Sequence, residues 1–410
     1  MKTLVEWTFL ILVFSVGFML PYFDLLNNRI PLTDFIFLGV SALWFLAFVF
    51  RKIKLRWSWF YLPLAIYFLS LVLSAIFSIN QKHSLLKLLG VIYLLGLAFL
   101  AFNIVQDAKM IKRSVLTWLI ATTVTCLVSI IALIVFYVDR ENWLLPYTLS
   151  HYGTLPPGNY PRIQSTFLNP NMYCNYLNIS AVFAVLAYKF GWVKTWLLYL
   201  FAVVFSIAAF FTISPGLGGI ALCLGLWLWL ELAEKGKSLL SKLSLAAGFL
   251  GALLFFVSML PSPVKFSEPS SRVLVWQDAV KTLFQYPVFG KGLGEDVAAV
   301  TYVDASGGTQ FLGDAHELWL NVAGEAGFIG LLAILFLTFY FFRQSLPLNF
   351  TDEKSYLRIG FGLAFIGAFM YQGLSGSFED ARQIWLLIGL FGAVVETDFS
   401  NQSESAKLST

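Results

Sequence analysis

The chain has 410 residues, of which 59% are hydrophobic, 17% aromatic and only 12% charged, and its formal net charge is +4. Soluble globular chains carry about 25% charged residues, so this composition excludes an ordinary soluble domain. The apolar residues form runs long enough to cross a bilayer core, which takes roughly 20 helical residues. Because long apolar runs without alternation indicate helices, we predict an all-α polytopic membrane protein.

Twelve apolar runs predict about twelve transmembrane helices. The first run follows Lys2 and lacks a small-residue cleavage site, so we expect a retained membrane helix. The break at 212–216, which reads Thr-Ile-Ser-Pro-Gly, predicts a tight hairpin between two spans, because one helix through it would be too long for the bilayer. The predicted spans are residues 4–23, 34–50, 57–78, 85–103, 115–138, 172–188, 193–213, 216–233, 242–260, 317–342, 356–374 and 383–396.

The lysines and arginines of the connections predict the orientation in the membrane. With the N-terminus inside, 17 of the 27 basic residues fall in cytoplasmic segments and 10 in outer ones. We therefore predict a multi-pass protein of the cytoplasmic membrane with both termini cytoplasmic. Nine spans with the outer loop 139–171 occupy residues 1–260, the large outer loop is 261–316, and three spans occupy 317–396. The polar tail 397–410 is expected to be disordered and cytoplasmic.

The first outer loop carries Arg162 ahead of a predicted helix start. Asn169-Pro170 predicts that start, because Asn caps helices and Pro suits their first turn. Arg162 is therefore expected at the mouth of the helix, at the membrane surface. Two interpretations are open: an arginine that extends to lipid headgroups, or a bidentate clamp for a phosphate-bearing substrate.

The second outer loop contains a predicted amphipathic helix at 272–285, capped at Ser270-Ser271 and ended by Pro287. Arg272 would lie in its first turn, where the helix dipole opposes a cation, which indicates a ligand requirement. The segment Gly290-Lys-Gly-Leu-Gly294 lacks the ending of a phosphate-binding P-loop and predicts a flexible turn. The apolar face of the helix is predicted to comprise Val273, Trp276, Val280, Leu283 and Phe284.

The segment Asp314-Ala-His-Glu317 predicts a capping box, with Asp314 as the cap and Glu317 three residues later. His316 would then lie in the first turn of the tenth span, at the outer surface. The positive helix end and nearby arginines would disfavour the imidazolium form. A neutral histidine can accept a proton, so His316 is a candidate general base; the alternative is a hydrogen-bonded interfacial histidine.

We expect no metal, no cofactor and no nucleic-acid partner. The cysteines Cys126, Cys174 and Cys223 lie in apolar runs without motif spacing, and no carboxylates form a DxD-type motif. The lack of a DxD-type motif argues against a metal-dependent glycosyltransferase that uses a sugar nucleotide.

Three groups of residues on the predicted outer side resemble, in their order and spacing, the signatures of the O-antigen ligase and polymerase superfamily. The first is Arg162-x-x-x-x-Phe167-x-Asn169-Pro170-Asn171, which precedes a span. The second is Arg272-x-x-x-Trp276, followed by Pro287-x-x-Gly290-x-Gly292. The third is Ala315-His316-Glu317, followed by Glu325-x-Gly327-x-x-Gly330.

The resemblance implies a metal-independent, inverting transferase of the helical membrane glycosyltransferase class. Its donor would be a glycan on undecaprenyl pyrophosphate, and its acceptor the lipid A core at the periplasmic face of the bacterial inner membrane. Arg162 and Arg272 would bind the pyrophosphate, and His316 would activate the acceptor hydroxyl. Many members carry Ser-Arg-Gly where this chain has Ser214-Pro215-Gly216, so Arg382 is the expected third cation.

Other activities remain open at this level. An O-antigen polymerase or a protein O-oligosaccharyltransferase would use the same donor; one dominant outer loop late in the chain favours the ligase. A transporter of lipid-linked glycans would also suit twelve spans. Transporters, however, place ionisable residues at the membrane midplane and have repeated halves, whereas here the polar residues gather on one side.

Overall fold

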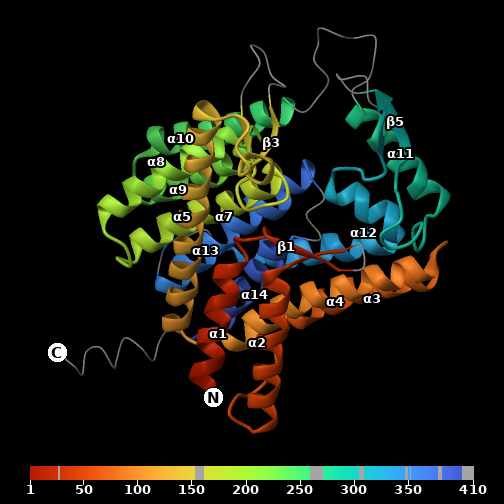
Figure 1. Ribbon diagram of the computed structural model, residues 1–410. Helices are drawn as coiled ribbons and strands as arrows, with labels where there is room; N and C mark the ends of the chain where they lie inside the picture. The colour runs from red at the N-terminus through yellow and green to blue at the C-terminus, as the bar shows by residue number, and fades with distance from the viewer. Residues whose placement is uncertain are drawn as a thin grey trace.

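The computed structural model describes residues 1–25, 28–152, 161–258, 271–303, 309–346, 350, 352–376 and 381–398. In these ranges the chain is mostly helical, and its strands form three two-stranded antiparallel hairpins. Figure 1 shows α1 and α2 side by side at the lower end, where the chain begins, and α11 with β5 at the upper end. The predicted all-α class is confirmed.

Every predicted span overlaps a helix of the structure. The helices that overlap the predicted spans are α1 (Lys2–Ser15), α2 (Leu32–Val49), α3 (Tyr61–Ile76), α4 (Gln81–Ile104), α5 (Ala108–Val138), α7 (Pro170–Lys189), α8 (Thr195–Phe211), α9 (Leu217–Glu234), α10 (Ser238–Val257), α12 (Leu318–Gln344), α13 (Glu353–Phe365) and α14 (Arg382–Glu396). A π-helical turn (Ile366–Tyr371) and a 3₁₀ turn (Gln372–Leu374) continue α13.

The remaining elements belong to the connections. They are α6 (Leu145–Thr148), α11 (Ser271–Gln285) and the hairpins β1–β2 (Tyr22–Leu25, Asn28–Pro31), β3–β4 (Leu149–Tyr152, Pro161–Ile163) and β5–β6 (Val300–Val303, Thr309–Leu312). The predicted helical hairpin at 212–216 is confirmed, since α8 ends at Phe211 and α9 begins at Leu217.

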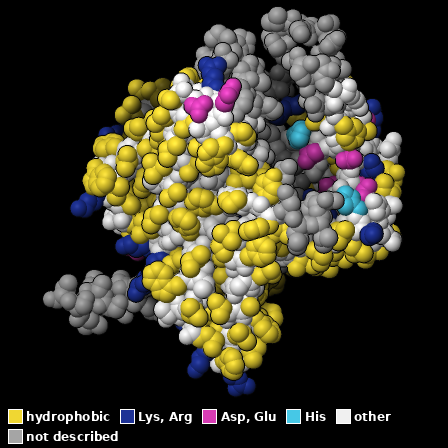
Figure 2. Space-filling model, viewed as in Figure 1, with side chains coloured by type: hydrophobic (Ala, Val, Ile, Leu, Met, Phe, Trp, Pro, Cys, Tyr) yellow, Lys and Arg dark blue, Asp and Glu magenta, His cyan; other side chains and the backbone are white. Residues whose placement is uncertain are grey.

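Within the described residues, seven helices are long and apolar enough to cross a membrane. Few residues in the apolar stretch of α10 are buried inside the structure, whereas most residues in the apolar stretches of α12 and α13 are buried. Figure 2 shows hydrophobic side chains over most of the body at the left and below, as lipid contact requires. The chain is therefore a helical membrane protein. The seven helices are α2, α4, α5, α9, α10, α12 and α13 with its continuation to Leu374.

The first predicted span, 4–23, was wrong at its end, because α1 stops at Ser15. The N–H groups of Met19 and Leu20 both donate to Thr166 O at 2.9 Å. The following residues form the β1–β2 hairpin. Hydrogen bonds to the distant loop that carries Thr166 thus replace helical hydrogen bonds. The sequence of residues 4–23 alone does not predict this tertiary contact.

The helix α12 is interrupted at Gly327, which has φ 66° and ψ −163°. Two N–H groups of the turn 287–292 donate to Gly324 O and Glu325 O, at 2.9 and 3.1 Å. Phe328 N–H donates back to this turn at 2.8 Å. The turn thereby satisfies backbone groups that the break leaves without helical partners.

The glycine-rich segment 290–294 was predicted to be a flexible turn, and the structure corrects this to a docked one. Its three glycines all have positive φ, with 74° at Gly290. A Cβ on Gly290 would lie 2.2 Å from the carbonyl carbon and oxygen of Glu325. Glycine is therefore required both by the conformation and by the close approach of two backbones.

We expect Gly290→Ala to destabilise the protein by about 3 kcal/mol, because left-handed strain adds to a backbone clash. Gly39→Ala is the matched control, since a Cβ on Gly39 of α2 meets nothing within 4 Å. Thermal unfolding in detergent compares the two variants. Equal melting temperatures would contradict the docked turn.

Candidate functional site

Arg162 lies in β4 and is held by the two neighbouring segments. Its Nε donates to Thr212 O at 2.9 Å, and its Nη2 donates to Asn171 Oδ1 at 3.0 Å. Asn169 caps α7 as predicted, accepting from Met172 N–H at 2.8 Å. The cap fixes the start of α7, and Asn171 in its first turn orients the guanidinium.

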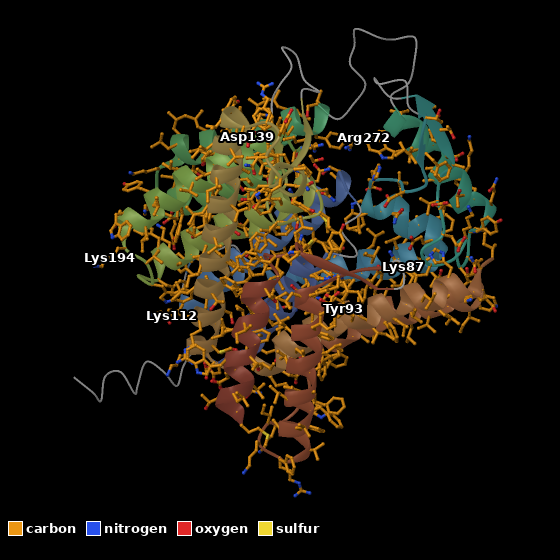
Figure 3. All side chains as sticks on the ribbon, viewed as in Figure 1. Lys87, Tyr93, Lys112, Asp139, Lys194 and Arg272 are labelled. Carbon is orange, nitrogen blue, oxygen red and sulfur yellow. The ribbon has the colours of Figure 1, made fainter. Side chains whose placement is uncertain are left out.

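Arg272 lies at the start of α11 and comes near Arg162. Burial and then the positive charge of Arg272 lower the pKa of Arg162. Burial also lowers the pKa of Arg272. Figure 3 shows Arg272 at the end of α11 that lies toward the β3–β4 side. Two partly buried cations from separate segments of the chain therefore act on each other, an arrangement that an anion between them would stabilise.

The helix α11 links this pair to the start of α12. Trp276, one turn after Arg272, donates from Nε1 to Ala315 O at 3.1 Å. His316 follows Ala315 directly. One hydrogen bond thus joins the segment of Arg272 and Trp276 to the segment of Ala315 and His316.

The predicted apolar face of α11 was wrong in part. Leu283 is buried as predicted, but Phe284 is 69% exposed and Val280 37% exposed. The buried face instead carries Val275 and Ala279, which pack on small residues of the same loop. Ser270 of the predicted cap lies outside the described residues, and Ser271 is the first residue of α11. The residues packed against Val275 and Ala279 are Val297, Ala298 and Ala315.

His316 lies before α12, and this corrects the predicted capping box. The cap is Glu317, whose Oε2 accepts from Leu320 N–H at 2.5 Å, and α12 begins at Leu318. Asp314 instead accepts the backbone N–H of His316, also at 2.5 Å. His316 therefore lies outside the helix and not in its first turn as predicted.

His316 has a strained backbone and an open side chain. Its φ is 48°, in the left-handed region that non-glycine residues seldom adopt. Its imidazole is 48% exposed, and Nδ1 lies 3.7 Å from Asp314 Oδ1. Strain of this kind costs about 1–3 kcal/mol and clusters at functional sites. An exposed ring with a carboxylate beside one nitrogen can accept a proton at the other.

Glu317 is a buried carboxyl group next to this histidine, only 6% exposed. Burial raises its pKa from the ordinary 4.5 to about 7, although backbone N–H groups of Leu320 and Trp319 oppose the shift. The sequence identified Glu317 only as a helix cap. Its burial depends on packing that the local pattern does not contain.

Glu317 should make stability depend on pH. Because its folded pKa lies above the unfolded value, the ionised carboxylate destabilises the fold above pH 7, by about 3 kcal/mol at 1.36 kcal/mol per pKa unit. This cost is relieved as the pH falls from about 7 toward 4.5. Glu317→Gln keeps the cap acceptor, so it should raise the melting temperature at pH 8 but not at pH 5.

Thermal unfolding at the two pH values measures this difference. Glu353→Gln, which changes an exposed carboxylate in the first turn of α13, serves as the matched control and should show no such dependence. A gain for Glu317→Gln that is the same at both pH values would contradict the buried-carboxylate assignment.

Arg382 was the expected third cation, and the structure gives it another partner. Its Nε and Nη2 donate to the two carboxylate oxygens of Asp34, both at 2.8 Å, and Nε also donates to Tyr93 OH at 3.1 Å. The guanidinium also lies 5.4 Å from the Tyr93 ring centroid. This neutralised ion pair joins α2, α4 and α14, so Arg382 acts in packing rather than in anion binding.

The turn that carries Pro215 still contributes to the site. Its Thr212 carbonyl receives Arg162. A Cβ on Gly216 would lie 1.8 Å from Gln372 Nε2. The buried Asn175 of α7 donates to Gln372 Oε1 at 2.6 Å and accepts from Gln383 Nε2 at 3.3 Å. This buried network of amide side chains was not predicted from the sequence. The available signal was the presence of isolated Asn and Gln residues inside apolar runs.

Other candidate groups of the sequence are dispersed. His83 pairs with Glu295 at 2.9 Å. The three cysteines are buried, free thiols. Among the described residues, no three His, Cys, Asp or Glu side chains gather as metal ligands. The side chain of His151 and the residues Glu379 and Asp380 lie outside the described set.

An apolar cavity of 390 Å³ reaches the two ends of the turn that contacts Arg162. It lies between α7, α8, α9 and α10, and its lining includes Phe210 and Leu217, the residues on either side of the α8–α9 turn. That turn supplies the carbonyl that binds Arg162. The cavity and the arginine pair are therefore connected through the α8–α9 turn.

No protein-family model matches the chain, and no curated protein matches it. Its function is therefore inferred from the residues of this site.

Proposed function

We propose that the protein is an O-antigen ligase: a metal-independent, inverting glycosyltransferase in lipopolysaccharide biosynthesis. It would transfer a glycan from undecaprenyl pyrophosphate to a hydroxyl group of the lipid A core oligosaccharide. The observation that carries this proposal is the pair Arg162 and Arg272, joined through Trp276 to the segment of His316. The proposal includes twelve spans in the bacterial inner membrane, cytoplasmic termini and a periplasmic active site.

The arginine pair suits a pyrophosphate leaving group. Departure of the lipid pyrophosphate develops negative charge, and preorganised cations at that position lower the barrier without a metal. The positive charge of Arg272 contributes to the lowered pKa of Arg162, as two like charges near each other do. A dianionic group between them would offset these like charges and form bidentate bonds. Arg162 is preoriented by Thr212 and Asn171.

His316 is assigned as the general base for the acceptor hydroxyl. A sugar hydroxyl needs a base within hydrogen-bond reach to become a good nucleophile. The exposed imidazole can be approached from outside the membrane, where a core oligosaccharide would lie. Asp314 lies beside Nδ1 and can orient the ring.

The cavity of 390 Å³ suits the isoprenoid tail of the donor. Its lining is almost entirely hydrophobic and lies among α7 to α10. A lipid tail in this cavity would bring its pyrophosphate to the α8–α9 turn, which contacts Arg162. The headgroup and tail sites are therefore adjacent, as one lipid-linked donor requires.

Reconstitution of the purified protein in liposomes tests the proposal. Given a glycan on undecaprenyl pyrophosphate, we expect transfer only when lipid A core is added, and we expect it to persist with a chelator. Longer carrier-linked glycan without core would identify an O-antigen polymerase, and glycosylated protein a protein O-oligosaccharyltransferase. Donor movement across the bilayer without any transfer would identify a transporter and contradict the enzyme assignment.

A further inference from the structure

A second cavity, of 260 Å³, lies apart from the residues of the candidate active site. Three segments line it: the start of α1, the connection between α2 and α3, and the end of α4. Figure 2 shows basic side chains at the lower tip of the molecule, where α1 begins and α2 ends. The charge distribution of the connections predicts this end to be cytoplasmic.

The lining of this cavity is positively charged. It contains Lys2, Lys52 and Lys54 against a single carboxylate, Glu6. That carboxylate already lies 4.0 Å from Lys2 Nζ and 4.0 Å from an Arg113 nitrogen. Neither Lys52 nor Lys54 forms an ion pair among the described residues. The cavity therefore has cationic groups left to bind an anion.

The inner wall of the cavity is fixed by hydrogen bonds. Asn103 is fully buried, accepts Arg56 N–H at 3.0 Å and donates to Tyr61 OH at 2.9 Å. Arg56 Nη1 donates to Phe102 O and Val105 O at the end of α4. A cation at a helix C-terminus is stabilising. The connection that carries Lys52 and Lys54 is thereby anchored against α4.

Tryptophans around the cavity indicate its depth in the membrane. Trp57 and Trp59 are 86% and 78% exposed, and Trp7 is 56% exposed. The Arg113 guanidinium lies 5.6 Å from the Trp7 ring centroid. Exposed tryptophans of membrane proteins concentrate at the level of the lipid headgroups. The segments that line the cavity are therefore expected at the depth of the lipid headgroups.

We propose that this cavity binds the phosphate group of an anionic phospholipid. Basic pockets between membrane helices on the cytoplasmic side bind such headgroups. The cluster of Lys2, Lys52 and Lys54 would contact the phosphate, and the exposed apolar surface of α2 would contact the acyl chains. This binding does not depend on the proposed glycan transfer.

Native mass spectrometry of the full chain in detergent tests the site with dioleoyl phosphatidylglycerol as the probe. We expect the double variant Lys52→Gln/Lys54→Gln to bind this lipid about tenfold more weakly than the natural protein. Lys109→Gln/Lys112→Gln is the matched control: it removes the same charge from α5, outside the cavity lining, and should change binding less than twofold. The melting temperatures of both variants should match that of the natural protein.

Two further probes separate the sources of the phosphate. Dioleoyl phosphatidylcholine, which has no net charge, should bind at least tenfold more weakly than phosphatidylglycerol. Inorganic phosphate at the same concentration should not compete. Equal losses in the two double variants would mean a general charge effect and overturn the proposal; competition by inorganic phosphate would replace the lipid site with a free-anion site.

Discussion

Replacing His316 with asparagine is expected to reduce glycan transfer by about 10²- to 10⁴-fold, the usual contribution of a general base. The loss should fall on kcat, because the donor is bound by the arginines and not by this ring. Asparagine is chosen because it tolerates the left-handed conformation, φ 48°, that this position requires. The backbone before α12 should therefore be retained while the base is removed.

His316→Ala would be harder to interpret, because alanine removes the imidazole and also disfavours positive φ. A loss of activity could then come from the missing base or from a changed backbone. Glycine gives a useful comparison: His316→Gly should be as inactive as the asparagine variant but somewhat more stable. His83→Asn is the matched control, because His83 is also about half exposed and pairs with a different carboxylate, Glu295. Transfer by His316→Asn at the rate of the natural protein would reject the base assignment.

Helices and turns were predictable from the sequence where residues close together in the chain determine them. Each apolar run overlaps a helix, since a run inside a membrane must satisfy its own backbone groups. The start of α7 was predictable because Asn169 and Pro170 act within one turn. The turn at 212–216 was predictable for the same reason.

The errors share a physical cause, namely contacts between residues far apart in the chain. The end of α1 depends on Thr166, and the partner of Arg382 is Asp34. At the start of α12 two residues could serve as the cap, and the pattern does not rank Asp314 against Glu317. In the structure Glu317 is the cap, and its side chain accepts from Leu320 N–H.

The candidate site was predictable as a set of residues but not as an arrangement. Arg162, Arg272 and His316 were identified from sequence, and the structure links their segments through Trp276 and Ala315. The buried carboxyl group of Glu317 was not predictable as a titrating group. Its raised pKa follows from desolvation, which a linear sequence does not specify.

Arg272→Met is expected to lower glycan transfer by about 10²- to 10³-fold, comparable to the removal of one preorganised donor from a site of developing charge. We expect the ligand-free protein to remain folded. The reason is that Arg272 is partly desolvated and its charge opposes that of Arg162. Methionine retains an unbranched apolar chain while removing the cation.

A loss of activity without a loss of stability separates substrate binding from folding. Functional sites often carry such unfavourable charges, which are relieved when the ligand binds. Added undecaprenyl pyrophosphate should therefore raise the melting temperature of the natural protein more than that of Arg272→Met, by mass action on the folded state. Lys281→Met is the matched control on the same helix, since Lys281 is exposed and pairs with Asp278 at 3.4 Å.

Arg162→Lys extends the test to the other member of the pair. Lysine keeps the charge but cannot donate to Thr212 O and Asn171 Oδ1 in the fork geometry of arginine. If the two arginines hold one pyrophosphate, the losses from Arg162→Lys and Arg272→Met should not add in the double variant. Additive losses would mean that the two cations act separately, and normal transfer by Arg272→Met would exclude the pyrophosphate clamp.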